Sequence, residues 1–101
     1  PTNANDLAEA ILKIIDTKPK TYGIYHFSNY PETTWLEFAK KIAEFSGSSV
    51  KLNYLTTEQY PTPAKRPKRS TMNLDKIEKT YQIELKHWEN SLQDAVSILQ
   101  N

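Results

Sequence analysis

The chain has 101 residues, of which 38% are hydrophobic and 25% are charged, and its formal net charge is +1. This size and composition indicate a single domain with a thin core. The lack of cysteine excludes disulfides and thiolate metal sites, the two histidines form no metal-binding pair, and no apolar run is long enough to cross a membrane.

The first third of the chain shows a helical pattern and then a strand pattern. Residues 7–15 carry apolar side chains at helical spacing, with Asn3 as a cap and Asp6 as a first-turn anion. Gly23 precedes residues 24–28, whose β-branched and aromatic side chains are typical of a buried strand. A ring hydrogen bond within this strand is the expected role of His26.

The middle of the chain predicts a second helix and a second strand. Thr34 and Glu37 match a capping box, and Gly47 is a suitable residue to end the helix that follows. Residues 50–55 alternate apolar and polar side chains, as a strand with one wet face does. Four aromatic residues lie at the helical spacing of a core: Trp35, Phe38, Phe45 and Trp88.

A cationic segment, residues 60–70, follows. Three prolines between Pro61 and Pro67 make it neither helix nor regular strand, and four Lys or Arg side chains fall within residues 65–69. The charge is local, since residues 65–79 carry six Lys or Arg against two Asp or Glu. This segment therefore predicts contact with an anion, unless its charge is only solvated.

The last third predicts two helices. Asn73 can cap a short helix that continues to Tyr81, and a final helix is expected from about His87 to Leu99. The predicted fold class is α/β, a small domain with a βαβ unit of two parallel strands packed with flanking helices. The expected order is helix, strand, helix, strand, loop, helix, helix.

Five motifs in this order resemble the C-terminal portion of the dTDP-4-dehydrorhamnose reductase family of extended short-chain dehydrogenases. The resemblance covers almost the whole chain. The motifs are Pro1-Thr2 with Asp6-Leu7-Ala8, Gly23 to Phe27, Thr34 to Ala39, Glu58 to Pro67 with Ser70, and Ile83-x-Leu85 with Trp88 and Ser91-Leu92.

The resemblance implies NADPH-dependent reduction of the 4-keto group of a dTDP-linked sugar, giving dTDP-L-rhamnose, in a cytoplasmic enzyme. It further implies an N-terminal Rossmann domain that binds NADPH. We expect residues 1–101 to be only the substrate-binding lobe, a fragment beginning at Pro1, with the Rossmann domain absent. The resemblance leaves a homodimer open for the parent protein.

The chain alone is predicted to be catalytically inactive. With Gly23 and Gly47 as its two glycines, it cannot form a glycine-rich dinucleotide loop. No tyrosine is followed four positions later by lysine, the pair on which the family depends. We therefore predict no catalytic, cofactor-binding or metal-binding residues here, and no bound cofactor.

The resemblance implies that the cationic segment lies near the substrate diphosphate, and Arg66 is the first candidate ligand. Its planar guanidinium can donate two parallel hydrogen bonds to phosphate oxygens, and Pro67 restricts the backbone. Lys65 and Arg69 are weaker candidates, and Arg69 departs from the family, where an uncharged residue is common. Tyr60 is a candidate to pack on thymine or the sugar.

Other readings stay open. The lobe also resembles the non-catalytic regulatory beta subunit of methionine adenosyltransferase, which serves in a protein complex. A basic interaction domain with an acidic partner is a third hypothesis, whereas neither a nucleic acid nor a membrane is expected as a partner. Glu32 and Glu37 are interpreted as helix-start electrostatics.

Overall fold

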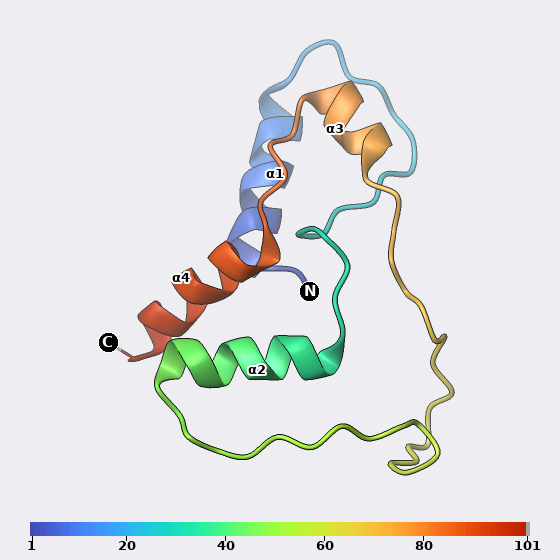
Figure 1. Cartoon of the computed structure of the whole chain (residues 1–101). Coiled ribbons are helices and arrows are strands. Elements are labelled where there is room, and N and C mark those ends of the chain that lie inside the picture. Colours follow the sequence, from blue (N-terminus) through green and yellow to red (C-terminus); the bar gives the residue numbers. More distant parts are fainter. Residues whose placement is uncertain (101) are drawn as a thin grey trace.

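The computed structural model describes residues 1–100, which form four helices joined by extended segments (Figure 1). Their Cα radius of gyration is 16.4 Å, whereas a compact domain of this size has about 13 Å. The excess arises because residues 47–74 run around the outside of the molecule, from the second helix to the third. The helices are α1 (Ala4–Asp16), α2 (Trp35–Ser46), α3 (Asp75–Tyr81) and α4 (Trp88–Gln100).

Local signals set the ends of α1 and α2, as predicted. The side chain of Asn3 accepts a hydrogen bond from the Asn5 backbone N–H at 2.8 Å and caps α1. Thr34 caps α2 through a 3.2 Å bond from the Glu37 N–H. Gly47 ends α2 in the left-handed region, with φ 73°, where a side chain would be strained.

The two C-terminal helices also lie close to their predicted positions. The Asn73 side chain accepts a hydrogen bond from the Asp75 N–H at 2.9 Å, so it satisfies a donor at the start of α3. Gln82 ends α3 with φ 52° and ψ 41°, the left-handed conformation that glycine adopts more readily. Helix α4 begins at Trp88, one residue after the predicted start.

The hydrophobic core is small and joins α1 to α3. Ala10 of α1 forms one buried cluster with Ile77 and Tyr81 of α3 and the adjoining residue Ile83. Partly buried side chains from three segments pack against this cluster: Ile14, Tyr25, Phe27 and Leu85. The prediction of a thin core is therefore confirmed for residues 1–100.

The predicted α/β fold class is wrong, because residues 1–100 contain helices but no strand or sheet. Residues 24–28 are extended but form no ladder, and one isolated parallel bridge joins Tyr30 to His87. Residues 50–55 lie in the outer segment, where Val50 and Tyr54 are 63% and 71% exposed. A parallel sheet requires cover on both faces, and nothing within the described residues covers this segment.

Helix α2 packs along α4, which places two of the four predicted core aromatics together. The Phe38 and Trp88 rings lie 5.9 Å apart between centroids, and Trp88 is buried, as predicted. Trp35 was predicted to be core but is 85% exposed. It occupies the first turn of α2, where the helix has no neighbour to bury it.

Candidate functional site

The cationic segment lies in the outer part of the molecule and is exposed throughout residues 60–70. A turn precedes it, in which the Thr56 N–H donates to the Gln59 side chain at 2.8 Å and the Tyr60 N–H donates to the Thr56 carbonyl at 3.1 Å. The segment then continues without helix or strand, as its prolines predict. Its cations are therefore presented to solvent on a backbone with few internal contacts.

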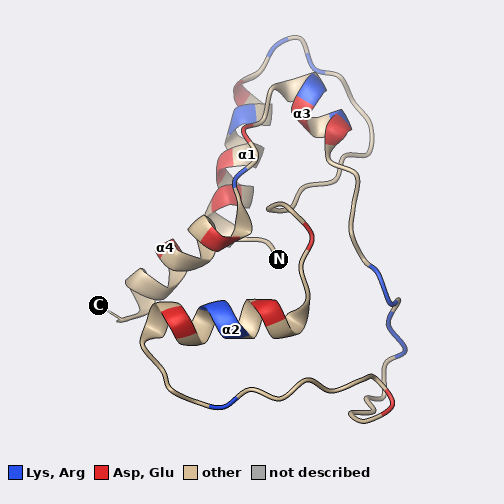
Figure 2. Ribbon diagram, viewed as in Figure 1, with Lys and Arg blue, Asp and Glu red and all other residues tan. Residues whose placement is uncertain are grey.

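The four cations of this segment fall into two groups. Within residues 1–100, no carboxylate lies within 4.0 Å of the side-chain nitrogens of Lys65, Arg66 or Lys68. Figure 2 shows these basic residues along the outer segment, away from the helices. Arg69 differs, because its guanidinium is paired with Glu32. Three adjacent cations thus remain available to an anion from solution.

Arg69 and Glu32 form a two-pronged ion pair. Arg69 Nε donates to Glu32 Oε2 at 2.8 Å, and Arg69 Nη2 donates to Glu32 Oε1 at 2.7 Å. The Thr71 hydroxyl donates to the same carboxylate at 2.5 Å. We call this group of three side chains, Glu32, Arg69 and Thr71, the Glu32 clasp. The interpretation of Glu32 as helix-start electrostatics is wrong, since its carboxylate is engaged with these donors.

The Glu32 clasp affects the ionisation of its carboxyl group. Hydrogen bonds from Thr71, and then from Arg69, hold the pKa of Glu32 below its ordinary value, because both donors stabilise the charged form. The carboxylate is therefore ionised at neutral pH.

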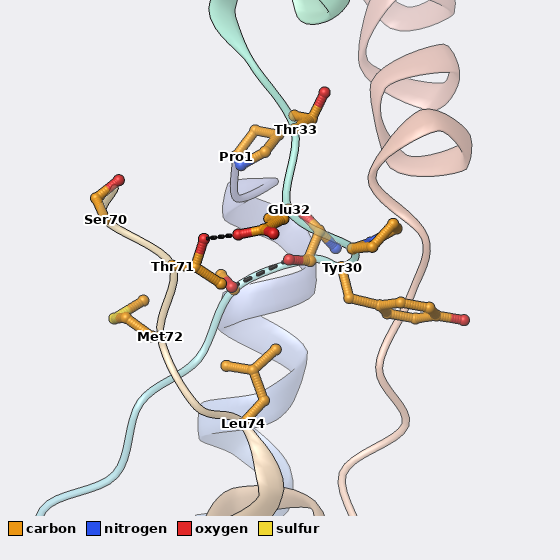
Figure 3. A pocket seen from close by; sticks show the side chains of 11 residues that line it. Pro1, Tyr30, Glu32, Thr33, Ser70, Thr71, Met72 and Leu74 are labelled. Atoms are coloured by element: carbon orange, nitrogen blue, oxygen red, sulfur yellow. Dashed lines mark hydrogen bonds between the residues drawn. The ribbon is translucent and has the colours of Figure 1, made fainter. Parts of the chain in front are cut away.

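A cavity of about 220 Å³ lies beside the Glu32 clasp (Figure 3). One wall comes from the residues that follow the cationic segment, and the opposite wall comes from the segment before α2. Of the motif residues, Pro1 and Ser70 line this cavity, whereas Lys65, Arg66 and Tyr60 do not. The lining residues are Pro1, Ser28, Asn29, Tyr30, Pro31, Glu32, Thr33, Ser70, Thr71, Met72 and Leu74.

A polar cluster adjoins the cavity through Asn29, which also lines it. Asn29 is 5% exposed; its side chain accepts from the Asn3 N–H at 2.7 Å and donates to Asp6 at 2.8 Å. Ser91, also buried, donates to the Asp6 carboxylate, and Lys86 lies 3.3 Å from it. Three separate parts of the chain, residues 3–6, Asn29 and residues 86–91, therefore meet through polar contacts at this point.

The carboxyl group of Asp6 is subject to opposing influences. Burial raises the pKa of Asp6, but hydrogen bonds from Ser91, Asn29 and Lys86 outweigh burial, and the net pKa is lowered. The partner Lys86 has a raised pKa, because hydrogen bonds to Asp6 and Glu9 favour its charged form. Asp6 and Lys86 are therefore a charged pair at neutral pH.

The predicted site residues are not brought together into a closed pocket. Tyr60 is 68% exposed, and it lies on the same open segment as Lys65 and Arg66. Sequence reasoning missed the roles of Glu32 and Thr71. The sequence gives only a weak signal for the Glu32 ion pair. Glu32 is the one acidic residue between positions 17 and 36, and its partner Arg69 lies 37 residues further along the chain.

Neither a metal-binding group nor a membrane-spanning helix is found within residues 1–100. Residues 1–100 contain no group of three or more His, Cys, Asp or Glu side chains arranged to hold a metal ion. None of the four helices is both long and apolar enough to cross a membrane.

Residues 1–100 thus form a helical lobe whose outer segment presents cations to solvent. The family model described as the RmlD substrate binding domain matches residues 1–101. The chain therefore belongs to the RmlD substrate binding domain family, which confirms the resemblance to dTDP-4-dehydrorhamnose reductases. No solved structure matches the chain.

Similar proteins carry reductase and polysaccharide-biosynthesis names. A dTDP-4-dehydrorhamnose reductase of Sinorhizobium fredii is 34% identical over 105 residues, covering 95% of this chain and 36% of the relative. The Aggregatibacter actinomycetemcomitans protein of that name is 36% identical over 104 residues, covering 93% and 35%. Spore coat polysaccharide biosynthesis protein SpsK of Bacillus subtilis is 38% identical over 94 residues, covering 93% and 32%. The chain thus spans about a third of the length of these relatives.

Proposed function

We propose that this chain is the substrate-binding lobe of an NADPH-dependent dTDP-4-dehydrorhamnose reductase and that its cationic segment binds the diphosphate of a dTDP-sugar. The observation that carries the proposal is the family match over residues 1–101, combined with three adjacent cations that have no carboxylate partner in the described chain. Phosphate oxygens are strong acceptors, and a guanidinium can donate to two of them at once.

Arg66 is the central ligand in this proposal. Its flanking cations, Lys65 and Lys68, add charge without directional hydrogen bonding. Arg69 contributes less, because Glu32 already neutralises its charge. Tyr60 precedes the cations on the same segment, and its exposed ring is available to pack on the thymine or the sugar.

Reduction of the sugar requires a nicotinamide and a proton donor held against the keto group, and we propose that a Rossmann domain outside these 101 residues supplies both. Exposed apolar side chains on α1 support this partner, because a monomeric domain rarely leaves such a group uncovered. They are Leu7, Ile11, Leu12 and Ile15.

Binding is tested by titrating the 101-residue chain with dTDP and with thymidine while recording backbone amide shifts. We expect residues 60–69 to shift with dTDP and much less with thymidine, which lacks the diphosphate. Arg66→Ala should weaken dTDP binding about tenfold or more, and Arg66→Lys less, because lysine retains the charge. Lys51→Ala, an exposed lysine elsewhere on the outer segment, is the matched control.

Two outcomes would contradict the proposal. The first is an absence of shifts in residues 60–69 at millimolar dTDP. The second concerns catalysis: NADPH oxidation by the purified chain with a 4-keto sugar nucleotide would show that a cofactor site exists within these residues. We expect no oxidation above a chain-free control.

A further inference from the structure

The Glu32 clasp joins two segments that are otherwise far apart in the chain. Glu32 lies just before α2, and Arg69 and Thr71 lie at the end of the outer segment. Between Gly47 and Arg69, no residue is buried, so few packing contacts hold the segment in place. We propose that the clasp anchors the cationic segment and that Arg69 is a positioning residue, not an anion ligand.

The geometry of the ion pair supports a positioning role. Both carboxylate oxygens of Glu32 accept from Arg69, one from Nε and one from Nη2, which fixes the plane of the guanidinium. The Thr71 hydroxyl, two residues after Arg69, is a third donor to the Glu32 carboxylate. The clasp thereby holds Arg69 and Thr71 on either side of Ser70, and Ser70 and Thr71 line the cavity.

The distribution of charge along the cationic segment also supports a positioning role for Arg69. Pairing with Glu32 cancels the charge of Arg69, while Lys65, Arg66 and Lys68 keep theirs. An anion that took Arg69 from Glu32 would leave that carboxylate beside the anion, where like charges repel. The ligand is therefore expected to bind the three preceding cations while the clasp stays closed.

The clasp is exposed, with 75% and 47% of the Arg69 and Glu32 side chains accessible. Exposed ion pairs stabilise a protein by about 1 kcal/mol or less, so opening the clasp should alter the order of the segment rather than the fold. The clasp can therefore be opened by substitution without unfolding the protein.

The experiment measures ¹⁵N relaxation at residues 66–73 in the unaltered chain and in four variants, all without ligand. Glu32→Gln and Arg69→Gln should each lower the ¹⁵N heteronuclear NOE of Ser70 and Thr71, with helical circular dichroism unchanged. The double variant should match Glu32→Gln, because that change alone already removes the carboxylate that Arg69 and Thr71 share. The charge swap E32R/R69E should restore much of the order at these residues.

Additive effects of the two single changes, or no change at residues 66–73 in either variant, would overturn the proposal. Lys68→Gln is the matched control, since this neighbouring cation has no carboxylate partner in the described chain, and its loss should leave the relaxation of Thr71 unaltered.

A second measurement separates positioning from anion binding, and here the inference rests on the proposed function. Inorganic pyrophosphate is titrated against the unaltered chain and Glu32→Gln. If Arg69 were an anion ligand, its release from Glu32 would tighten pyrophosphate binding by Glu32→Gln. An anchoring clasp instead predicts that Glu32→Gln binds pyrophosphate equally well or more weakly than the unaltered chain. Tighter binding by Glu32→Gln overturns the proposal. If neither form binds, the proposed function fails, and the relaxation experiment still decides the clasp.

Discussion

The polar cluster around Asn29 and the Glu32 clasp both join distant parts of the chain through carboxylates, but their surroundings differ. Asn29 and Ser91 are buried, and their hydrogen bonds to Asp6 are shielded from water. The clasp has charged hydrogen bonds of 2.5 to 2.8 Å, yet its side chains are exposed. Burial therefore decides which of the two groups stabilises the fold and which only orders the cationic segment.

The hydrophobic residues show the same difference between a buried region and an exposed one. Ile77 belongs to the small core between α1 and α3, whereas Leu52 lies on the outer segment. One half of the molecule is thus a folded support, and the outer segment is an arm attached to it. Four predictions test how sharply these two regions differ, beginning with the largest expected effect.

Ile77→Ala should lower the free energy of unfolding by about 2–5 kcal/mol, because it removes buried methyl groups and leaves a cavity. Leu52→Ala on the outer segment should cost less than about 0.5 kcal/mol. Urea unfolding of both variants provides the measurement. Equal losses at the two positions would contradict the division into a support and an arm.

Asn29→Ala should cost about 1–3 kcal/mol, because it leaves the Asn3 N–H without its acceptor and removes one of the donors to the Asp6 carboxylate. The same change at Asn53, which is exposed on the outer segment, is the control and should be nearly neutral. Thermal unfolding of the two variants compares them directly. A neutral Asn29→Ala would mean that the cluster does not support the fold.

Gly47→Ala tests the junction between the two regions. Its φ of 73° is strained for alanine, and a Cβ there would meet no atom within 4 Å, so the expected cost of about 1 kcal/mol is a backbone effect. The loss is read from urea unfolding, with exposed Ser49→Ala as the control. A stabilised Gly47→Ala would show that the backbone can relax at this junction.

Acidification should weaken the support through Asp6, and we expect this effect to be the smallest, because burial offsets part of the hydrogen bonding. The folded pKa of Asp6 is lowered, so its contribution is complete above the unfolded pKa. It is lost as the pH falls through the folded pKa.

The test compares urea unfolding of the unaltered chain and Asp6→Asn at several pH values below neutrality. The variant should lack the part of the acid sensitivity that belongs to Asp6, while the exposed Asp94→Asn should retain it. An identical acid dependence in the unaltered chain and Asp6→Asn would contradict the prediction.

Sequence reasoning located the four helices and much of their capping, because the signals are short-range. The Asn3 cap, the Thr34 cap and the left-handed Gly47 each depend on residues within four positions of one another. The exposed, irregular character of the cationic segment followed from its prolines for the same reason. The family was also readable from the order of five motifs.

The errors arose where a residue's environment depends on distant parts of the chain. Residues 24–28 and 50–55 have strand-like composition, but composition does not supply a pairing partner or a layer to cover the sheet. Trp35 has the spacing of a core residue, yet no neighbouring element reaches it. Periodicity records which face a helix could bury, not whether anything lies against that face.

By itself, the sequence determined the helices, the local concentration of positive charge and the family, since all three reside in neighbouring residues or their order. Tertiary structure alone decided the pairing of Arg69 with Glu32, the cluster around Asn29 and the absence of a sheet within residues 1–100. Hydrogen bonds and ion pairs require atoms within a few ångströms, and only folding brings positions 32 and 69, or 29 and 91, to that distance.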